Sequence, residues 1–215
     1  MGDPSGSLSS CKRSRTLRRV GNGGSRRPGR GGRERVLAAA RTLFATRGIN
    51  ATTMEDVAAQ APVSKRTLYA HFPTKDDLVL AQLRALAETG DTLHAVLTRE
   101  DIPARDRLLA MFDIPAPAAG PVRGCPFVDA AAEFPDPDSA AHSYARTQKL
   151  LMLRLVFDLV TELGVVQPEV LAQQLVTLAD GAASRAMVLD DAGYGCHARA
   201  AATTLIEHAE RRSTE

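Results

Sequence analysis

Several residue types are scarce in this chain of 215 residues, and their scarcity argues against a disulfide framework and against a metal site. Tryptophan is absent, and all aromatic residues together make up only 4% of the chain. The three cysteines show no CxxC spacing, which indicates reduced thiols rather than a disulfide framework. Cys125, directly before Pro126, is either a structural thiol or a redox sensor. The five histidines form no i, i+4 pair, so we predict no metal site and no cofactor.

Motifs for catalysis and for membrane insertion are missing as well. The chain contains no nucleophile elbow, P-loop or GxGxxG fingerprint, so we predict that it is not an enzyme and has no catalytic residues. No apolar run is long enough to span a membrane, and no apolar core of a signal peptide is present. These absences favour a cytoplasmic binding protein that does not act at a membrane.

The composition favours helices, and the basic residues are distributed unevenly along the chain. Hydrophobic residues make up 44% of the chain, and alanine is abundant, which favours an all-α fold. Nine of the 27 Lys and Arg residues lie within residues 1–33, where Asp3 is the only acidic residue. Residues 1–32 also lack apolar periodicity, so we expect a disordered basic arm. Such an arm either binds a polyanion or is a passive solvated tail.

Three short helical patterns follow within residues 33–80. The first has apolar residues at i, i+4 and i+7 and ends at Gly48, an expected helix stop. The second starts with the capping box Thr52-x-x-Glu55, and the third begins at Ser64, a good N-cap. The spacing therefore predicts three helices joined by short turns.

The second and third patterns together are typical of a helix-turn-helix. In such a unit the first helix supports the second, whose N-terminal side chains enter the major groove of DNA. Lys65 and Arg66 can neutralise phosphates or pair with guanine, and Thr67 can reach a phosphate or a thymine methyl group. The alternative is a small helical bundle with a solvated Lys–Arg pair.

The segment TTMEDVAAQAPVSKRTLYAHFPTKDDL closely resembles the signature of the TetR/AcrR family of repressors. The resemblance covers about residues 33–83 and implies a three-helix helix-turn-helix DNA-binding domain at residues 33–80. It further implies a helical ligand-binding and dimerisation domain at residues 81–215, and a palindromic double-stranded DNA operator as partner. By the same resemblance, the residues that contact DNA are Thr53, Ser64, Lys65, Arg66, Thr67, Tyr69, His71 and Lys75.

One residue departs from the family pattern. Pro62 stands where the family has a glycine in the turn between the two helices. Proline has no N–H, cannot take a positive φ, and disfavours helical angles at the preceding Ala61. We therefore expect the turn, and with it the aim of the second helix, to differ locally.

Further helical patterns fill residues 81–215. The pattern at 140–163 is apolar most of the way round, so we expect that helix to be central and buried. Small residues in the last two patterns allow close approach of a second backbone, which favours a homodimer interface; the alternative is packing within one chain. The expected helices run from Thr74 to about Thr98 and over residues 104–112, 140–163, 170–189 and 197–211.

A small-molecule effector is the last partner that we predict. The candidate walls of its pocket are mostly apolar, which favours a small hydrophobic or aromatic molecule. The alternatives are that these residues are ordinary core, and that the chain is a constitutive DNA-binding protein without an effector. The candidate ligand-binding residues are Leu109, Phe112, Phe127, Phe134, Tyr144, Leu151 and Phe157.

Overall fold

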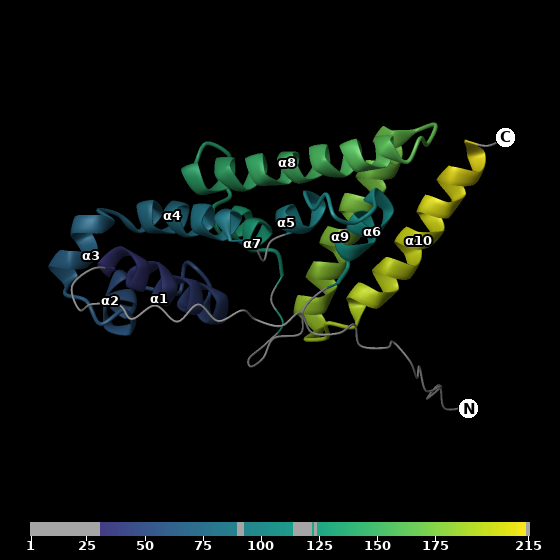
Figure 1. The fold of residues 1–215 in the computed structure, drawn as a ribbon. Helices are drawn as coiled ribbons and strands as arrows, with labels where there is room; N and C mark the ends of the chain where they lie inside the picture. Colours follow the sequence, from purple (N-terminus) through teal and green to yellow (C-terminus); the bar gives the residue numbers. More distant parts are fainter. Residues whose placement is uncertain (1–30, 90–92, 114–121, 123, 214–215) are drawn as a thin grey trace, which may run out of the picture. The chain divides into compact units, whose positions relative to one another are not determined.

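The computed structural model describes residues 31–89, 93–113, 122 and 124–213. The basic arm predicted for residues 1–32 therefore lies almost wholly outside the described residues. Within the described ranges the chain forms helices and no strand, which confirms the all-α prediction (Figure 1). The helices are α1 (Gly32–Arg47), α2 (Met54–Gln60), α3 (Lys65–His71), α4 (Lys75–Glu88), α5 (Leu93–Leu97), α6 (Ala104–Ala110), α7 (Pro126–Glu133), α8 (Ala140–Glu162), α9 (Pro168–Leu189) and α10 (Tyr194–Arg212).

The first three helices and the first turns of α4 pack around one hydrophobic core. Val36 of α1, Val57 of α2 and Leu68 of α3 are buried in it, and Leu78 of α4 joins them. The apolar spacing of the sequence thus produces the three predicted helices, and burial of their shared face holds α2 and α3 on either side of a short turn. The predicted boundary between residues 80 and 81 lies inside α4.

The N-terminus of α2 is capped one residue later than the sequence suggested. Thr53 is the N-cap: its hydroxyl oxygen accepts from the Asp56 N–H at 3.1 Å, and an Asp56 carboxylate oxygen accepts from the Thr53 N–H at 2.9 Å. The predicted box of Thr52 and Glu55 is therefore wrong. Thr52 is buried instead, and its hydroxyl donates to the carbonyl of Gly48 at 2.8 Å, because a buried hydroxyl needs a partner.

The turn between α2 and α3 keeps a conformation that suits glycine although it contains Pro62. The N–H of Val63 donates to the carbonyl of Ala58 at 3.3 Å, the long bond of a Schellman turn. Ala61 leaves helical angles as predicted, with φ −84° and ψ 4°, but Pro62 has φ 23°, so the prediction that it cannot be positive is wrong. The buried Ala61 and the Schellman bond hold the chain in this turn, which concentrates backbone strain at the pyrrolidine ring.

Replacing Pro62 with glycine should therefore stabilise the protein. Relief of the strained φ should outweigh the greater freedom of glycine in the unfolded chain and raise the free energy of unfolding by about 1 kcal/mol. Urea unfolding followed by circular dichroism measures this change. The control is Pro135→Gly at an exposed proline without a positive φ, which should lower the same free energy. Equal destabilisation by both substitutions would contradict strain at Pro62.

Helix α4 is shorter than predicted. It follows the N-cap Thr74 as expected but ends at Glu88, and α5 is a separate helix, so the continuous helix to Thr98 is wrong. Thr89 takes extended angles, and its hydroxyl donates to the carbonyl of Leu86 at 2.7 Å. A threonine side chain that bonds the preceding turn competes with the backbone and ends the helix there.

Helices α6, α8, α9 and α10 enclose the main core of the remaining chain. Val156, Leu175 and Ile206 are fully buried in it. α8 has the predicted extent and lies centrally, against α4, α5, α6, α7 and α9, but the expectation that it is buried holds only in part, because Leu150 and Leu151 are 56% and 39% exposed. Its neighbouring helices cover part of its circumference, and no described residue covers the apolar side chains on the rest of it.

The start of α10 also differs from the prediction. The helix begins at Tyr194 rather than His197 and includes Gly195, which is buried. A glycine inside a helix costs only about 1 kcal/mol of helix stability, which tertiary burial can offset.

The cysteines differ in state. Cys125 is a free thiol, whereas Cys196 is disulfide-bonded, so the expectation of reduced thiols is wrong for Cys196. Sequence spacing does not report which sulfur atoms a fold brings together.

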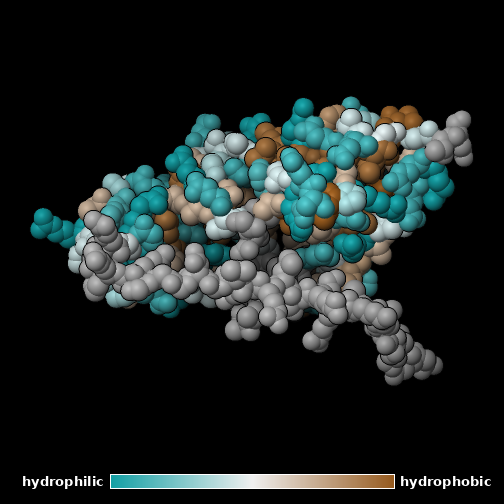
Figure 2. Space-filling model, in the orientation of Figure 1, coloured by the Kyte–Doolittle hydropathy of each residue, from teal (hydrophilic) through white to brown (hydrophobic). Residues whose placement is uncertain are grey.

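The surface is unevenly apolar. On the face drawn in Figure 2, hydrophobic residues lie mainly along α8 and toward its junction with α9, and hydrophilic residues predominate around α2 and α3. None of the described helices is both long and apolar enough to cross a membrane. Large apolar side chains that are strongly exposed on α8, α9 and the link between them are Leu150, Leu151, Val166, Val170, Val188 and Leu189.

Candidate nucleic-acid interface and apolar groove

The N-terminal turn of α3, with its N-cap, carries four of the eight predicted DNA contacts. Ser64 is its N-cap: the Oγ atom accepts from the Thr67 N–H at 3.1 Å and lies 2.8 Å from the Thr67 hydroxyl. Leu68 is fully buried, whereas Lys65 and Arg66 are exposed. α3 therefore buries one side in the first core and presents its N-terminal basic residues to solvent, as a helix that reads the major groove must.

The two basic residues differ in their contacts. Lys65 Nζ donates to Glu55 Oε1 at 2.9 Å. This hydrogen bond raises the pKa of Lys65 and lowers the pKa of Glu55, so both groups are charged at neutral pH. No ion pair to Arg66 forms within the described ranges. The Arg66 guanidinium is therefore available to a base edge, whereas Lys65 must exchange a carboxylate for a phosphate.

The C-terminal half of α3 lies beside the start of α1. Tyr69 and His71 are exposed, as DNA contacts would require. A Cβ atom on Gly32 would lie 3.2 Å from His71 Nε2, and the Arg33 guanidinium lies over the Phe72 ring, 5.6 Å from its centroid. The first residues of α1 are thus next to the helix that carries the predicted DNA contacts.

The remaining predicted contacts come from the N-termini of α2 and α4. Thr53, the N-cap of α2, is exposed. Thr74 caps α4 in a box with Asp77, and the neighbouring Lys75 donates from Nζ to the carbonyl of Asn50 at 3.2 Å. The eight predicted residues therefore gather on α3 and at two helix N-termini, where free N–H groups and the helix dipole attract phosphate.

Most of the predicted effector residues lie in two separate hydrophobic clusters, and their role in binding an effector stays a prediction. Leu109 and Phe112 are buried in the main core, and Phe157 is partly buried against the same core. Phe127, Phe134 and Tyr144 pack instead against a separate cluster at the junction of α4, α7 and α8. Leu151 is largely exposed and belongs to neither cluster. Sequence order did not distinguish the two cores, because both are built partly from α8.

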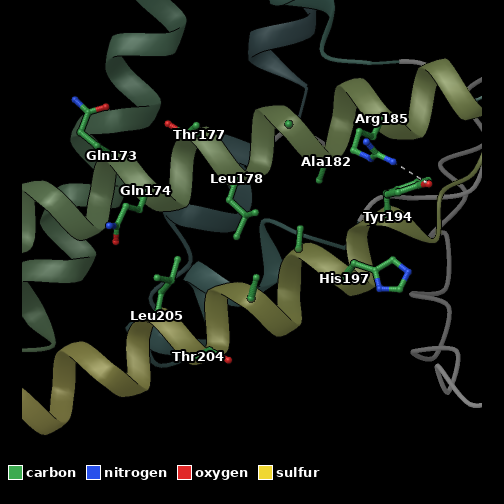
Figure 3. Close-up of a pocket in the computed structure, with 13 residues that line it drawn as sticks. Gln173, Gln174, Thr177, Leu178, Ala182, Arg185, Tyr194, His197, Thr204 and Leu205 are labelled. Atoms are coloured by element: carbon green, nitrogen blue, oxygen red, sulfur yellow. Dashed lines mark hydrogen bonds between the residues drawn. The ribbon is translucent and has the colours of Figure 1, made fainter.

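A groove of about 1010 Å³ runs between α9 and α10 (Figure 3). Leu178 of α9 and Leu205 of α10 point into the space between the two helices, and Arg185 donates to the Tyr194 hydroxyl at 3.3 Å at one end. The Arg185 guanidinium also lies 4.7 Å from the centroid of the Tyr194 ring. A Cβ atom on Gly181 would meet no other atom within 4 Å. The groove is therefore mostly apolar, with polar groups at its ends.

The groove continues toward the N-terminus of α9 and the C-terminus of α10. A second depression, of about 230 Å³, shares Gln174 and Leu205 with the first and is also lined by Val166 and Val170. Val188 is exposed at the opposite end of α9. Apolar and small residues thus follow the outer side of α9 along its length, and none of the described residues covers them, which is typical of protein interaction surfaces.

Two features were not predicted from the sequence. The groove residues Gln173, Thr177 and Arg185 recur at multiples of four along α9, a signal that could have marked an exposed stripe. Glu133 accepts hydrogen bonds from residues 83 and 84 positions earlier, and no local signal points to such a contact. No group of three or more His, Cys, Asp or Glu side chains that could hold a metal occurs in the part of the chain that the structure describes.

Comparison with known proteins agrees with this arrangement. The family model "Bacterial regulatory proteins, tetR family" matches residues 36–81. The chain is 30% identical over 159 residues to the HTH-type transcriptional regulator YjdC of Escherichia coli (strain K12), covering 73% of this chain and 83% of that protein. Over 52 residues it is 42% identical to the HTH-type transcriptional repressor KstR2 of Mycolicibacterium smegmatis, which covers 24% of this chain and 25% of the repressor.

A solved structure extends the likeness beyond the first helices. The crystal structure of a putative TetR transcriptional regulator (sav143) from Streptomyces avermitilis superposes with a TM-score of 0.70 at 29% sequence identity. The match covers 83% of this chain and 98% of that chain. Both the helix-turn-helix and the larger helical part are therefore shared.

Proposed function

The chain belongs to the TetR family of bacterial regulatory proteins, and we propose that it is a dimeric repressor that a small hydrophobic effector releases from a palindromic operator. As a member it is a DNA-binding transcription regulator and not an enzyme, and regulators of this family bind DNA and act as dimers. A related protein, KstR2, is named a repressor, which supports repression here. Action on the chromosome would place the protein in the cytoplasm.

The observation that carries the proposal is the N-terminus of α3. Ser64 caps a helix whose first two residues are basic and exposed and whose Leu68 is anchored in the three-helix core. In a major groove, Arg66 would pair with a guanine, and Lys65 would exchange Glu55 for a phosphate. Thr53, Thr67, Tyr69, His71 and Lys75 would then fix the position on the backbone.

The groove between α9 and α10 supports the dimer. A two-fold axis through it would place α9 and α10 of one protomer against the same helices of its partner, in a four-helix interface. Leu178, Leu205 and Val170 would gain a cover, and the open space at Gly181 would admit the partner's backbone. Two α3 helices related by that axis would fit half-sites about one helical turn apart, or a multiple of it.

Effector release would act through the junction between the DNA-binding helices and the larger part. Gln82 of α4 is 4% exposed, and its Oε1 atom has no hydrogen-bond donor among the described residues. A buried acceptor without a donor costs about 1–3 kcal/mol, which a donor group on an otherwise apolar effector could recover. Binding would favour a conformation whose two α3 helices no longer match the half-site spacing.

Removing residues 1–30 should weaken operator binding and flatten its dependence on salt. The segment contains eight Lys and Arg residues, and Gly32, close to its end, lies against His71. For every phosphate that the arm neutralises, its removal should reduce the slope of log K against log salt by about 0.9. Fluorescence anisotropy with operator DNA at several salt concentrations measures the slope. A full-length variant with the eight residues changed to serine is the control, and slopes equal to the wild type would make the arm a passive tail.

Footprinting of the protein on the DNA that flanks its own gene, over a salt series, tests the proposed function. A protected palindrome is expected, and small apolar and aromatic compounds added to that complex should include one that removes the protection. Only diffuse, strongly salt-dependent binding would contradict a specific regulator. A protected palindrome that no compound releases would favour the alternative of a constitutive DNA-binding protein.

A further inference from the structure

Glu133, at the C-terminal end of α7, contacts the turn between α1 and α2. Its Oε1 accepts from the N–H of Ile49 at 2.8 Å, and its Oε2 accepts from the N–H of Asn50 at 2.5 Å. The Asn50 side chain donates in return from Nδ2 to the Glu133 carbonyl at 3.2 Å. We propose that this contact, which we call the Glu133 contact, positions the DNA-binding helices relative to the larger helical part.

The turn is shaped to receive a carboxylate. Gly48 has φ 90°, a conformation that disfavours side chains, and a Cβ atom there would lie 3.4 Å from Glu133 Oε1. The buried Thr52 fixes the turn from the other side through its bond to the Gly48 carbonyl. Two successive N–H groups that point at one anion form a small nest, whose partial charges favour a carboxylate over a neutral group.

The same turn also touches a predicted DNA contact. The carbonyl of Asn50 accepts from Nζ of Lys75, the first residue of α4. Glu133, Asn50 and Lys75 therefore form a continuous series of hydrogen bonds from α7 to the N-terminus of α4. A displacement of α7 would move the turn and, with it, the ammonium group that would meet a phosphate.

The other end of the α7 segment is held by α9. Asp190 caps the C-terminus of α9, and its Oδ1 accepts from the N–H of Val122 at 2.6 Å. α9 also lines the groove that we assign to the dimer. The end of α9 thus contacts Val122, four residues before α7, and Glu133 at the other end of α7 contacts the α1–α2 turn, so the Glu133 contact would couple the dimer to the DNA-binding helices.

The apolar cluster at the junction between the DNA-binding helices and the larger helical part is small. The cluster between the two parts consists of five buried side chains, with four aromatic residues packed at its edge. Dispersion contacts tolerate sliding, whereas paired hydrogen bonds to a carboxylate specify both distance and direction. Glu133 is therefore a positioning residue rather than a DNA contact. The five buried residues are Ile49, Val79, Leu83, Ala130 and Ala141.

The substitution Glu133→Gln tests the proposal, which rests on the function proposed above. Glutamine keeps the size of the side chain but turns an NH₂ group toward one of the two backbone N–H groups. We expect operator affinity to fall about tenfold, since hydrogen bonds to charged groups are among the stronger ones, while affinity for unrelated DNA stays within about twofold. The control is Asp138→Asn, which removes an exposed carboxylate five residues later and should change neither affinity.

A double-mutant cycle with Lys75→Met tests the link to α4. If the series of hydrogen bonds transmits position, the loss in the double variant should be clearly smaller than the product of the two single losses. Independent losses would overturn the link. Equal losses of specific and unrelated DNA binding in Glu133→Gln would indicate a general folding defect and would overturn the positioning role.

Hydrogen–deuterium exchange of the DNA-free protein separates failure of this proposal from failure of the proposed function. Amides in residues 48–53 should be protected in the wild type and in Asp138→Asn, and should exchange at least about tenfold faster in Glu133→Gln. Protection that is unchanged in Glu133→Gln would overturn the Glu133 contact whatever the DNA result. If the wild-type protein protects no operator in the footprinting experiment, the proposed function is contradicted, but the exchange result still tests the Glu133 contact.

Discussion

Substituting Gly181 with arginine is expected to convert the dimer into a folded monomer. Gly181 lies on the groove of α9, and a Cβ atom there meets nothing within 4 Å, so a single chain accommodates the side chain. Within one chain, replacing a helical glycine should even stabilise the helix by up to about 1 kcal/mol. Across a two-fold interface, two guanidinium groups would face each other without acidic partners, and their burial should raise the dimer dissociation constant at least about a hundredfold.

Sedimentation equilibrium measures this change, and urea unfolding shows whether the monomer is intact. Gly181→Ala is the matched control, since it adds the same Cβ atom without charge and should weaken the dimer far less than arginine does. Operator affinity should fall with dimerisation, because a monomer binds one half-site only. A Gly181→Arg protein that sediments as a dimer would place the interface elsewhere.

Substituting Arg66 with alanine should cost about 1–3 kcal/mol of operator binding for each α3 helix that reads a base. Arg66 is exposed at the start of α3 and forms no ion pair with the described residues, so its guanidinium is free to make two parallel hydrogen bonds to guanine. The loss should be specific: affinity for unrelated DNA should change little, and the preference at one base pair of each half-site should relax.

Lys65→Ala is the informative comparison for Arg66→Ala. Lys65 is paired with Glu55 and is suited to a phosphate, so its removal should weaken binding to all sequences and reduce the salt slope by about one for each half-site. Binding to a set of operators with single base changes, by anisotropy, distinguishes the two residues. Arg66→Ala affinity equal to the wild type would rule out a base contact.

Local chemistry accounts for what could be predicted from the sequence. The N-caps at Ser64 and Thr74 and the helix end at Gly48 depend on residues within one turn of each other. Gly164, with φ 72°, ends α8 for the same kind of reason. The helix-turn-helix signature is a contiguous stretch, so it also indicated the family that the comparisons then showed.

Predictions from the sequence were wrong where two neighbouring residues could both cap a helix, or where burial in the folded protein determined the local conformation. Thr52 and Thr53 are both able to cap α2, and the choice fell to Thr53 because Thr52 is buried against Gly48. Burial also divides the candidate effector residues between two clusters, although their role in binding stays a prediction. At Pro62, tertiary packing and a Schellman bond outweighed the preference of the pyrrolidine ring.

The sequence by itself determined most of the helices, the position of the helix-turn-helix and the basic character of the first turn of α3, because these follow from short-range spacing and capping. Only the tertiary structure decided that Glu133 meets Ile49 and Asn50, and that a groove runs between α9 and α10 which no described residue fills. Such contacts join residues far apart in the chain, and their energies depend on distance and direction in space. Composition and periodicity carry no record of either quantity.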